Sequence, residues 1–229
     1  LADAVDRHLD PRWLNSLKKK LELPFFNLAQ GAANCSLDPL SMKRVLTPFL
    51  HGDPGTYKAL ILGGVRSGKS RLAESLAGDG GLPVTYIATA TAGDGEMRDR
   101  IAAHRARRPA QWGLIEEPVR LAEVLEAQAG ARRCLLVDCL TLWLTNLLLA
   151  ADETLFHRER AALVAVLPAL PGRIILVSNE TSMGIMPLGE LSRRFGDAAG
   201  QLHQDLAPLC DRVILAVAGL PVVLKGEGR

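Results

Sequence analysis

The sequence predicts an α/β fold in which a mainly parallel β-sheet carries helices on both faces. Apolar stretches with strand character alternate with helical stretches from Lys58 to the C-terminus, and this alternation indicates βαβ units. A glycine-rich turn at 63–70 stands between the first strand and the first helix of the pattern. Of the 229 residues, 48% are hydrophobic, so the chain can bury the core of a full domain.

The expected elements follow the chain in order. Residues 1–57 are expected to form a mostly helical N-terminal extension, because Leu14, Leu17 and Leu21 recur at helical spacing. Residues 58–229 are expected to form the main domain. Only 218–221 separate its last two strands, which predicts an antiparallel C-terminal hairpin. The strands are predicted at 58–62, 84–89, 114–116, 134–138, 174–178, 213–217 and 222–224, and the helices at 69–77, 95–107, 119–127, 140–149, 155–166 and 188–209.

The composition argues against several kinds of partner and location. Lys and Arg number 27 against 25 Asp and Glu, an excess too small to predict binding to nucleic acid or to a membrane surface. The stretch 134–151 has the length of a membrane span, but it contains Asp138 and later polar residues. These indicate a buried strand followed by a buried helix. The four cysteines are Cys35, Cys134, Cys139 and Cys210. They form no C-x-x-C pair and are expected to be reduced thiols of a cytoplasmic protein.

The glycine-rich turn predicts a site for a nucleoside triphosphate. It matches the pattern G-x-x-x-x-G-K-[ST], with a strand before it and a helix after it. In such a turn the backbone N–H groups surround the phosphates, and Lys69 reaches the β and γ phosphates. The Ser70 hydroxyl suits a phosphate-bound Mg²⁺. The alternative, a strand, turn and helix that carry a lysine by chance, is disfavoured because spacing and both flanks agree. The turn consists of Gly63, Gly64, Val65, Arg66, Ser67, Gly68, Lys69 and Ser70.

Asp138 is a second candidate, because it ends an apolar strand after the glycine-rich turn. A carboxylate in that position is expected to hold Mg²⁺ directly or through water. The alternative is an N-cap for the helix that follows. Both roles are compatible, so the sequence leaves both open.

A basic segment supplies a candidate nucleophile. A helix over 95–107 places Arg100, His104 and Arg108 at four-residue intervals on one face. The neighbouring positive charges disfavour the imidazolium form, so neutral, nucleophilic His104 is favoured. A solvated basic helix is an equally good interpretation of these residues alone. Likewise, 178–187 forms either a substrate-contacting loop or a simple connector.

Several motifs in order resemble one family. They are Gly-Gly-Val-Arg-Ser-Gly-Lys-Ser-Arg, Tyr-Ile-Ala-Thr-Ala, Glu-Met-x-x-Arg-Ile-x-x-His, Glu-Glu-Pro, Val-Asp-Cys-Leu-Thr-Leu-Trp and Ser-Asn-Glu-x-x-Met-Gly-Ile-x-Pro. From about residue 58 to the C-terminus the chain resembles the bifunctional adenosylcobinamide kinase / adenosylcobinamide-phosphate guanylyltransferase family. The first 57 residues lie outside this resemblance.

The resemblance implies a RecA-like P-loop nucleotide-binding fold and two reactions of cobalamin biosynthesis and salvage. In the first, GTP or ATP phosphorylates adenosylcobinamide. In the second, GTP transfers GMP to adenosylcobinamide phosphate, giving adenosylcobinamide-GDP. The resemblance implies that His104 carries the GMP and that Lys69 supports catalysis. It also implies Mg²⁺ on Ser70 and Asp138, and a homo-oligomer such as a trimer. The further nucleotide contacts that it implies are Ala88, Thr89, Ala90, Arg105, Ala106, Arg107, Arg108, Glu116 and Asp138.

Three alternatives stay open. A monofunctional P-loop kinase for a small molecule has no need of His104. A RecA-like ATPase acting on nucleic acid requires a basic surface, against which the near-neutral charge balance speaks. The extension 1–57 is either a docking module or the remnant of a fused partner.

Overall fold

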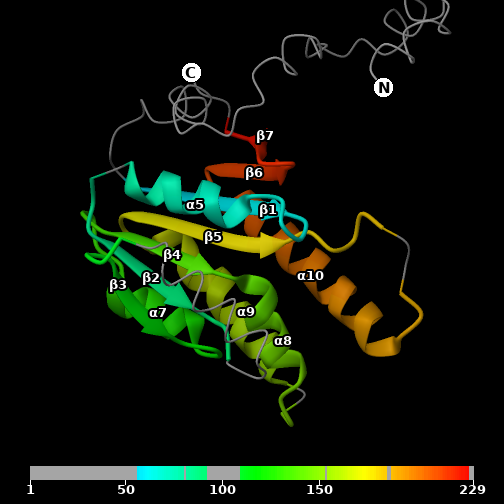
Figure 1. Cartoon of the computed structure of the whole chain (residues 1–229). Helices are drawn as coiled ribbons and strands as arrows, with labels where there is room; N and C mark the ends of the chain where they lie inside the picture. Colours follow the sequence, from blue (N-terminus) through cyan, green and yellow to red (C-terminus); the bar gives the residue numbers. More distant parts are fainter. Residues whose placement is uncertain (1–55, 80, 92–108, 153, 185–186, 227–229) are drawn as a thin grey trace, which may run out of the picture. The chain divides into compact units, whose positions relative to one another are not determined.

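We describe a computed structural model of the chain that covers residues 56–79, 81–91, 109–152, 154–184 and 187–226 (Figure 1). All of these residues belong to one compact unit, Leu46–Arg229. The helix predicted at 95–107 and nearly all of the predicted extension 1–57 lie outside the described residues, so these expectations stay predictions.

Seven strands form a single sheet, and six of them run parallel. Their bounds are β1 Tyr57–Gly63, β2 Val84–Ala88, β3 Gly113–Glu116, β4 Cys134–Asp138, β5 Arg173–Asn179, β6 Arg212–Val217 and β7 Leu220–Lys225. The strand order is β3-β2-β4-β5-β1-β6-β7. Only β7 is antiparallel to its neighbour, β6. The predicted parallel sheet with a C-terminal hairpin is therefore confirmed.

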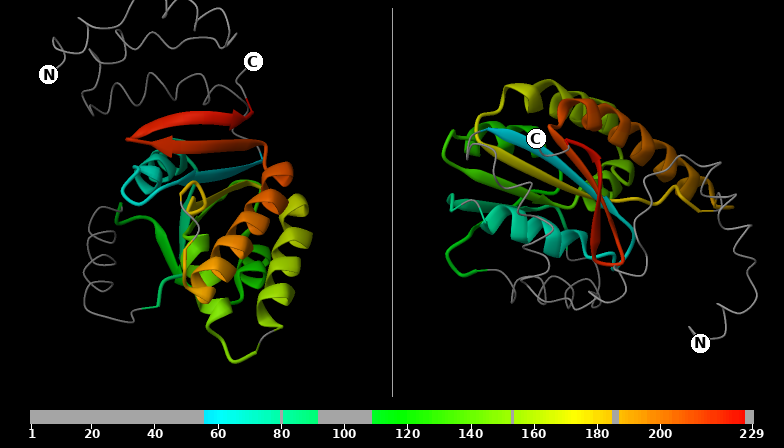
Figure 2. Two further views of the ribbon diagram at one scale, coloured as in Figure 1. Left: turned by 90° about the vertical axis from the view of Figure 1, so that its right-hand side faces the viewer. Right: turned by 90° about the horizontal axis from the view of Figure 1, so that it is seen from above.

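Helices cover both faces of the sheet. They are α5 Lys69–Gly78, α7 Leu121–Gln128, α8 Leu140–Leu148, α9 Leu155–Val166 and α10 Glu190–Leu209, with a short 3₁₀ helix at Leu167–Ala169. Figure 2 shows α5 on one face and α9 and α10 on the other. The buried side chains form two clusters that match this division, one beneath α5 and one beneath α7 to α10. This is the layering that the sequence predicts.

Where the boundaries differ from the prediction, local hydrogen bonds explain the shift. Helix α7 begins at Leu121 rather than at residue 119. A carboxylate oxygen of Glu117 accepts hydrogen bonds from the backbone N–H groups of Val119 and Arg120, at 2.8 and 2.7 Å. These two residues therefore form a turn ahead of the helix. Strand β7 begins at Leu220, two residues earlier than predicted, because Leu220 pairs with Val217 across the tight hairpin.

The apolar stretch 134–151, which has the length of a membrane span, is part of the core of the domain. It forms β4 and α8, as predicted, and none of the helices in the described part of the chain is long and apolar enough to cross a membrane. Cys134, Cys139 and Cys210 are free and buried. Burial raises the pKa of Cys134 and of Cys210 to about 12. Both thiols are therefore protonated at neutral pH and act as packing groups.

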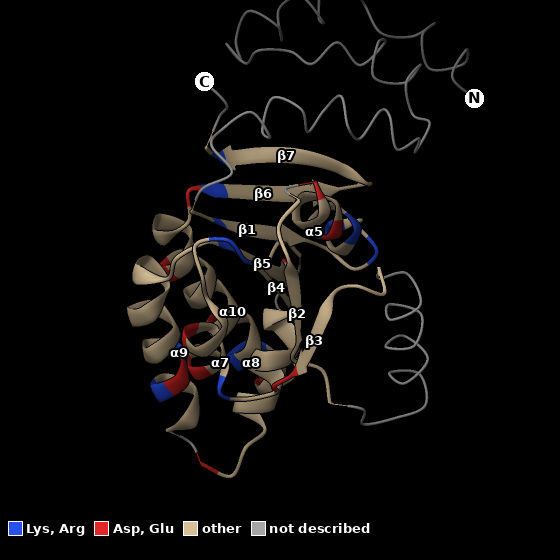
Figure 3. Ribbon diagram, turned by 90° about the vertical axis from the view of Figure 1, so that its left-hand side faces the viewer, with Lys and Arg blue, Asp and Glu red and all other residues tan. Residues whose placement is uncertain are grey.

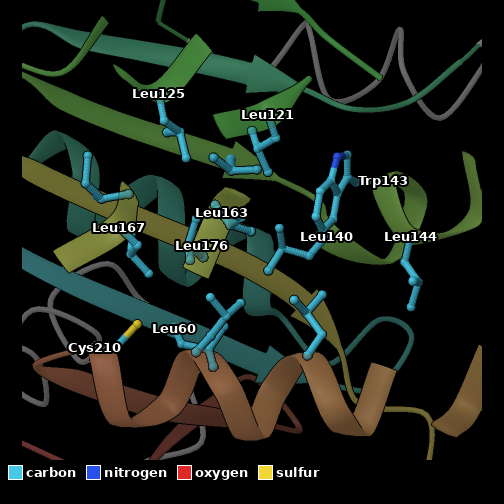
Figure 4. Packing of buried hydrophobic residues seen from close by; sticks show 14 of the residues in the cluster. Leu60, Leu121, Leu125, Leu140, Trp143, Leu144, Leu163, Leu167, Leu176 and Cys210 are labelled. Atoms are coloured by element: carbon cyan, nitrogen blue, oxygen red, sulfur yellow. The ribbon is translucent and has the colours of Figure 1, made fainter. Parts of the chain in front are cut away.

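The larger cluster contains Trp143 of α8, which is fully buried (Figure 4). Its indole N–H donates a 2.7 Å hydrogen bond to the carbonyl oxygen of Val119. The ring packs in one cluster with Leu121, Leu140 and Leu163. The hydrogen bond thus joins α8 to the turn ahead of α7.

We expect Trp143→Ala to destabilise the fold by about 3 to 5 kcal/mol, because it leaves a cavity and removes the indole's hydrogen bond to the Val119 carbonyl oxygen, which keeps only its 3.0 Å bond from the Leu121 N–H. Trp143→Phe keeps much of the volume and loses mainly the hydrogen bond, so its cost is expected to be smaller. Urea unfolding followed by circular dichroism measures both changes. Equal costs for the two variants would contradict the importance of the ring's volume.

Candidate nucleotide-binding site

The glycine-rich turn begins at a point where the sheet leaves no room for a side chain. A Cβ on Gly63 would lie 2.4 Å from Ser67 Oγ and 2.7 Å from the carbonyl oxygen of Ala216 in β6. Real Cβ atoms do not approach other atoms so closely. Gly63 is therefore required by packing against the neighbouring strand.

Two residues with positive φ shape the turn. Arg66 has φ 57° and Gly68 has φ 92°, and Gly68 is the N-cap of α5. The N–H of Ser67 donates to the carbonyl oxygen of Gly64 at 3.2 Å. Left-handed residues in such a turn direct successive backbone N–H groups toward one concave side, which suits an anion. The positive end of the α5 dipole lies at the same place.

The C-terminal hairpin of β6 and β7 contacts the glycine-rich turn. The N–H of Gly219, between β6 and β7, donates a 2.8 Å hydrogen bond to the carbonyl oxygen of Ser67. A Cβ on Gly68 would lie 3.0 Å from the Cα of Gly219. No motif in the sequence pointed to Gly219. The glycine between two predicted hairpin strands was the one available signal.

We expect Gly68→Ala to abolish nucleotide binding while leaving most of the fold intact. The new Cβ meets the backbone of Gly219, and φ 92° is strained for alanine. Isothermal titration with GTP and with ATP measures the loss. Gly184→Ala is a matched control, because a Cβ there meets nothing within 4 Å. Normal nucleotide affinity in Gly68→Ala would contradict this account of the turn.

The turn carries positive charge and a hydroxyl that has no hydrogen-bond partner. The Lys69 ammonium donates to the carbonyl oxygen of Gly64 at 3.3 Å, so it lies across the turn. The buried Oγ of Ser67 has no hydrogen-bond partner. Figure 3 shows basic residues gathered at the start of α5. The turn therefore offers donors and positive charge without an internal acceptor for all of them, as a phosphate site requires.

The strand register brings three predicted residues to one edge of the sheet. Ala88 of β2 pairs with Glu116 of β3 on one side and with Asp138 of β4 on the other. Because the strands are parallel, this is the same carboxyl edge at which the turn after β1 lies. Glu116 is exposed, whereas Ala88 and Asp138 are partly buried. Ala90 follows β2 and is partly buried as well.

Asp138 is held by a tyrosine. The Tyr86 hydroxyl donates a 2.7 Å hydrogen bond to Asp138 Oδ2. The N-cap position of α8 is Cys139 rather than Asp138, so the helix is capped one residue later than the N-cap alternative requires. The carboxylate thus has a fixed orientation at the end of β4.

Hydrogen bonds of Thr89 connect the end of β2 to the residue that follows β4. The Thr89 side chain is fully buried. Its Oγ1 donates to the carbonyl oxygen of Cys139 at 2.7 Å and accepts from the Cys139 N–H at 3.0 Å. The amide of Asn146 on α8 donates to the Thr89 carbonyl oxygen at 2.8 Å. The hydroxyl of Thr89, a residue that the family resemblance implies as a nucleotide contact, is therefore bound to the protein's own backbone.

The end of β5 carries polar residues that the sequence analysis did not assign to the nucleotide site. Asn179 pairs with Gly63 in the sheet, and its buried Oδ1 has no hydrogen-bond partner. The N–H of Glu180 donates to the carbonyl oxygen of Gly63 at 3.0 Å. The signal was present in the sequence, since Ser-Asn-Glu follows the strand directly, but the interpretation as a connector was equally open.

A cavity of about 430 Å³ lies beside this strand end. It is formed by the end of α8, the loop after β5 and the start of α10; its lining residues are Thr145, Leu148, Leu149, Thr181, Ser182, Gly184, Pro187, Leu191, Ser192, Phe195, Gly196 and Asp197. Its size is in the range of small-molecule sites. The predicted nucleophile His104 and its neighbours Arg105, Ala106, Arg107 and Arg108 lie outside the described residues.

Comparison with known proteins identifies the family. A family model described as CobU, cobinamide kinase / cobinamide phosphate guanyltransferase, matches residues 59–224. The chain belongs to the CobU family. The bifunctional adenosylcobalamin biosynthesis protein CobP of Pseudomonas aeruginosa is 67% identical over 168 residues, which cover 73% of this chain and 97% of that protein. CobU of Escherichia coli is 38% identical over 179 residues, 72% of this chain and 98% of that protein.

Membership of the CobU family confirms the resemblance stated from the motifs, and with it an enzyme that combines cobinamide kinase and cobinamide phosphate guanylyltransferase activities. The RecA-like P-loop fold is confirmed as well, with its mainly parallel sheet and the turn after β1. Among solved structures, the flagellar accessory protein FlaH of Methanocaldococcus jannaschii is similar with a TM-score of 0.46 at 14% identity, covering 86% of this chain and 89% of that chain.

The residues at the turn fit a metal-bound nucleotide. Ser70 is the second residue of α5, and Asp138 offers a carboxylate at the same edge of the sheet. Within the described ranges no group of three or more His, Cys, Asp or Glu side chains is placed to hold a metal ion. A hydroxyl and one carboxylate suffice when phosphate oxygens and water supply the remaining Mg²⁺ ligands.

Proposed function

We propose that this chain phosphorylates adenosylcobinamide with GTP or ATP and then transfers GMP from GTP to the phosphate that it has made. The observation that carries the proposal is the phosphate-binding turn, with Lys69 lying across it, in a chain of the CobU family. Ser70 and Asp138 would hold Mg²⁺, which neutralises phosphate charge.

Different residues of the protein act in the two steps. In the kinase step, the backbone N–H groups of the turn and Lys69 bind the triphosphate and stabilise the charge that develops on it. In the transfer step, a neutral nitrogen of His104 attacks the α-phosphorus of GTP, and the bond to the α–β bridging oxygen breaks to release pyrophosphate. A phosphate oxygen of adenosylcobinamide phosphate then displaces the histidine. The guanine contact is assigned to Glu116, whose carboxylate can accept from N1–H and N2–H₂.

The cavity beside β5 is suited to the acceptor. Its volume of about 430 Å³ is too small for a corrin macrocycle but large enough for the aminopropanol arm that carries the reacting hydroxyl. Two large apolar residues of its lining, Leu149 and Leu191, are exposed, and so are Met183 and Leu188, which are next in the chain to lining residues. Exposed apolar groups gathered in one place are typical of a binding surface. In this proposal the macrocycle lies on them while the arm enters.

The experiment supplies the protein with adenosylcobinamide and with GTP that is radiolabelled at either the γ- or the α-phosphate. The γ label is expected in adenosylcobinamide phosphate, and the α label in adenosylcobinamide-GDP. Without acceptor, an acid-labile, base-stable α label is expected on the protein. Kinase product without any α label would reduce the proposal to a monofunctional kinase, and neither product would overturn it.

Replacing an apolar residue at the cavity mouth should weaken acceptor binding. Leu191→Ser or Leu149→Ser is expected to raise the KM for adenosylcobinamide about tenfold, because each removes apolar contact worth roughly 1.5 kcal/mol. Labelling of the protein by GTP alone should not change. Leu220→Ser on β7 is a control, since this exposed leucine does not line the cavity. An unchanged KM in both variants would contradict acceptor binding at this surface.

We propose further that the enzyme is cytoplasmic and that it works as a homo-oligomer, with a trimer as the expected form. Residues 1–57 are proposed to be an extension outside the catalytic domain. Light scattering coupled to gel filtration gives the oligomeric state. Comparing the full chain with a version that lacks residues 1–57 tests the extension. Loss of assembly in the shorter version indicates a docking module, whereas unchanged assembly and activity indicate a remnant.

A further inference from the structure

A buried chain of polar side chains connects α8, β5 and α10 beside the phosphate-binding turn. Ser178 Oγ lies 2.8 Å from His203 Nε2 and 3.5 Å from Thr141 Oγ1. The other ring nitrogen, His203 Nδ1, lies 3.7 Å from Glu180 Oε2. Thr141 Oγ1 accepts from the Asn179 N–H at 2.7 Å, so its own proton is available to Ser178. A neutral imidazole protonated on Nδ1 accepts from the Ser178 hydroxyl at Nε2 and directs its N–H toward Glu180, 3.7 Å away.

The exposure of the members shows which of them can meet a substrate. Serine, histidine and a carboxylate also make up hydrolase triads, but Ser178 is only 2% exposed. The side chains of His203 and Glu180 are 10% and 12% exposed. Ser178 is therefore an internal support rather than a nucleophile. The carboxylate of Glu180 is the end of the chain that is open to a ligand.

Glu180 lies between the two parts of the proposed kinase site. Its N–H binds the carbonyl oxygen of Gly63, the first residue of the turn, at 3.0 Å. The next two residues, Thr181 and Ser182, line the cavity. Glu180 is therefore bonded to the turn through its backbone and adjacent in the chain to the cavity lining, which is where a hydroxyl in the cavity would approach a phosphate on the turn.

The carboxylate is ionised and held at both oxygens. Oε1 accepts from the Ser182 N–H at 2.7 Å and from the Ser182 hydroxyl, and Oε2 faces His203. Burial acts to raise the pKa of Glu180, but the hydrogen bonds from the Ser182 hydroxyl and N–H outweigh it and hold this pKa below its usual value. Burial lowers the pKa of His203. Glu180 is thus negative and His203 neutral at neutral pH.

We propose that Glu180 is the base of the kinase step and that His203, supported by Ser178 and Thr141, is the positioning residue that orients it. The inference rests on the kinase activity proposed above. The acceptor oxygen forms a bond to the γ-phosphorus, and the bond between that phosphorus and the β–γ bridging oxygen breaks to release the nucleoside diphosphate. The proton of the acceptor hydroxyl passes to the Glu180 carboxylate. Aspartate serves kinases of another class in the same way.

The two half-reactions differ in their need for this base. The kinase acceptor is a neutral hydroxyl, which must lose a proton. The acceptor of the guanylyl transfer is an ionised phosphate oxygen, which carries no proton to remove. Glu180 therefore serves the first reaction only, which separates this inference from the proposed function as a whole.

The test measures both half-reactions in Glu180→Gln, with adenosylcobinamide and γ-labelled GTP for one and adenosylcobinamide phosphate and α-labelled GTP for the other. The kinase kcat is expected to fall by roughly 10² to 10⁴-fold, the usual contribution of a general base, with guanylyl transfer unchanged. Retained transfer also shows that the variant is folded. Glu123→Gln, on the exposed face of α7, is the matched control. An unchanged kinase kcat, or an equal fall in both activities, overturns the assignment. If the wild-type protein itself lacks kinase activity, the proposed function fails instead.

The positioning role of His203 has its own readout. The Nδ2 of an asparagine side chain corresponds to Nδ1 of histidine, so His203→Asn keeps a donor toward Glu180, whereas His203→Ala does not. We expect kinase kcat to fall in His203→Ala at unchanged KM for the nucleotide, and to be partly restored in His203→Asn. Thermal unfolding of both variants is measured alongside, and His157→Asn on the exposed side of α9 is the control. Equal kinase rates in the two variants, or rates that follow their melting temperatures, overturn the positioning role.

Discussion

His104→Ala is expected to abolish guanylyl transfer and to leave the kinase step unchanged. If His104 forms the covalent bond to GMP, its removal takes away the nucleophile itself. Loss of a nucleophile lowers turnover by at least about 10⁴-fold in enzymes that depend on one. Formation of adenosylcobinamide-GDP from adenosylcobinamide phosphate and α-labelled GTP measures the loss. Formation of adenosylcobinamide phosphate, measured in parallel, reports on the P-loop.

The matched control is His157→Ala, which removes an exposed histidine on α9. It is expected to retain both activities and the α label on the protein. A His104→Ala protein that still carries acid-labile α label would show that another residue accepts the GMP. If His104→Ala lost both activities while keeping its melting temperature, His104 would act in nucleotide binding rather than as the nucleophile.

Lys69→Ala is expected to reduce both activities by about 10²-fold or more, the usual cost of removing a donor from a developing negative charge. In the described structure the ammonium lies 3.3 Å from the carbonyl oxygen of Gly64, directly across the phosphate-binding turn. In the proposed function both reactions place a triphosphate on this turn, so both need the charge. Rates of each half-reaction at saturating GTP measure the effect, and isothermal titration separates weaker binding from slower chemistry.

Arg71→Ala is the control for general loss of positive charge, since Arg71 is exposed on the same helix. It is expected to keep both activities within a small factor. Lys69→Arg is expected to remain impaired, because a planar guanidinium does not replace a compact ammonium in a close-fitting turn. If Lys69→Ala impaired only one of the two activities, the two reactions would not share the turn.

Much of the fold and part of the site could be predicted because short-range patterns encode them. The spacing of Gly63, Gly68 and Lys69, with an apolar strand before and a helix after, is specific enough to predict a phosphate-binding turn. Apolar runs of strand length fixed β4 and β5, which are buried on both faces. The hairpin of β6 and β7 followed from the short connection between them.

Other parts of the site depend on contacts between residues that are distant in the sequence. The support of the turn by Gly219, the bond between Thr89 and Cys139 and the contact between Ser178 and His203 have no local signature. In the sequence, His203 lies in the middle of an amphipathic helix, where a polar residue on the buried face is not recognisable as a partner of Ser178. Local hydrogen bonds likewise decided where α7 begins.

The sequence by itself therefore determined the family, the parallel sheet and the predicted place of a triphosphate, because periodicity and motif spacing are properties of neighbouring residues. Only the tertiary structure decided that Glu180 stands between the turn and the cavity and that His203 faces it. The physical reason is that a strand tip, a helix face and a hairpin turn meet only after the sheet has formed. Which polar groups then become partners depends on the register and packing of whole elements.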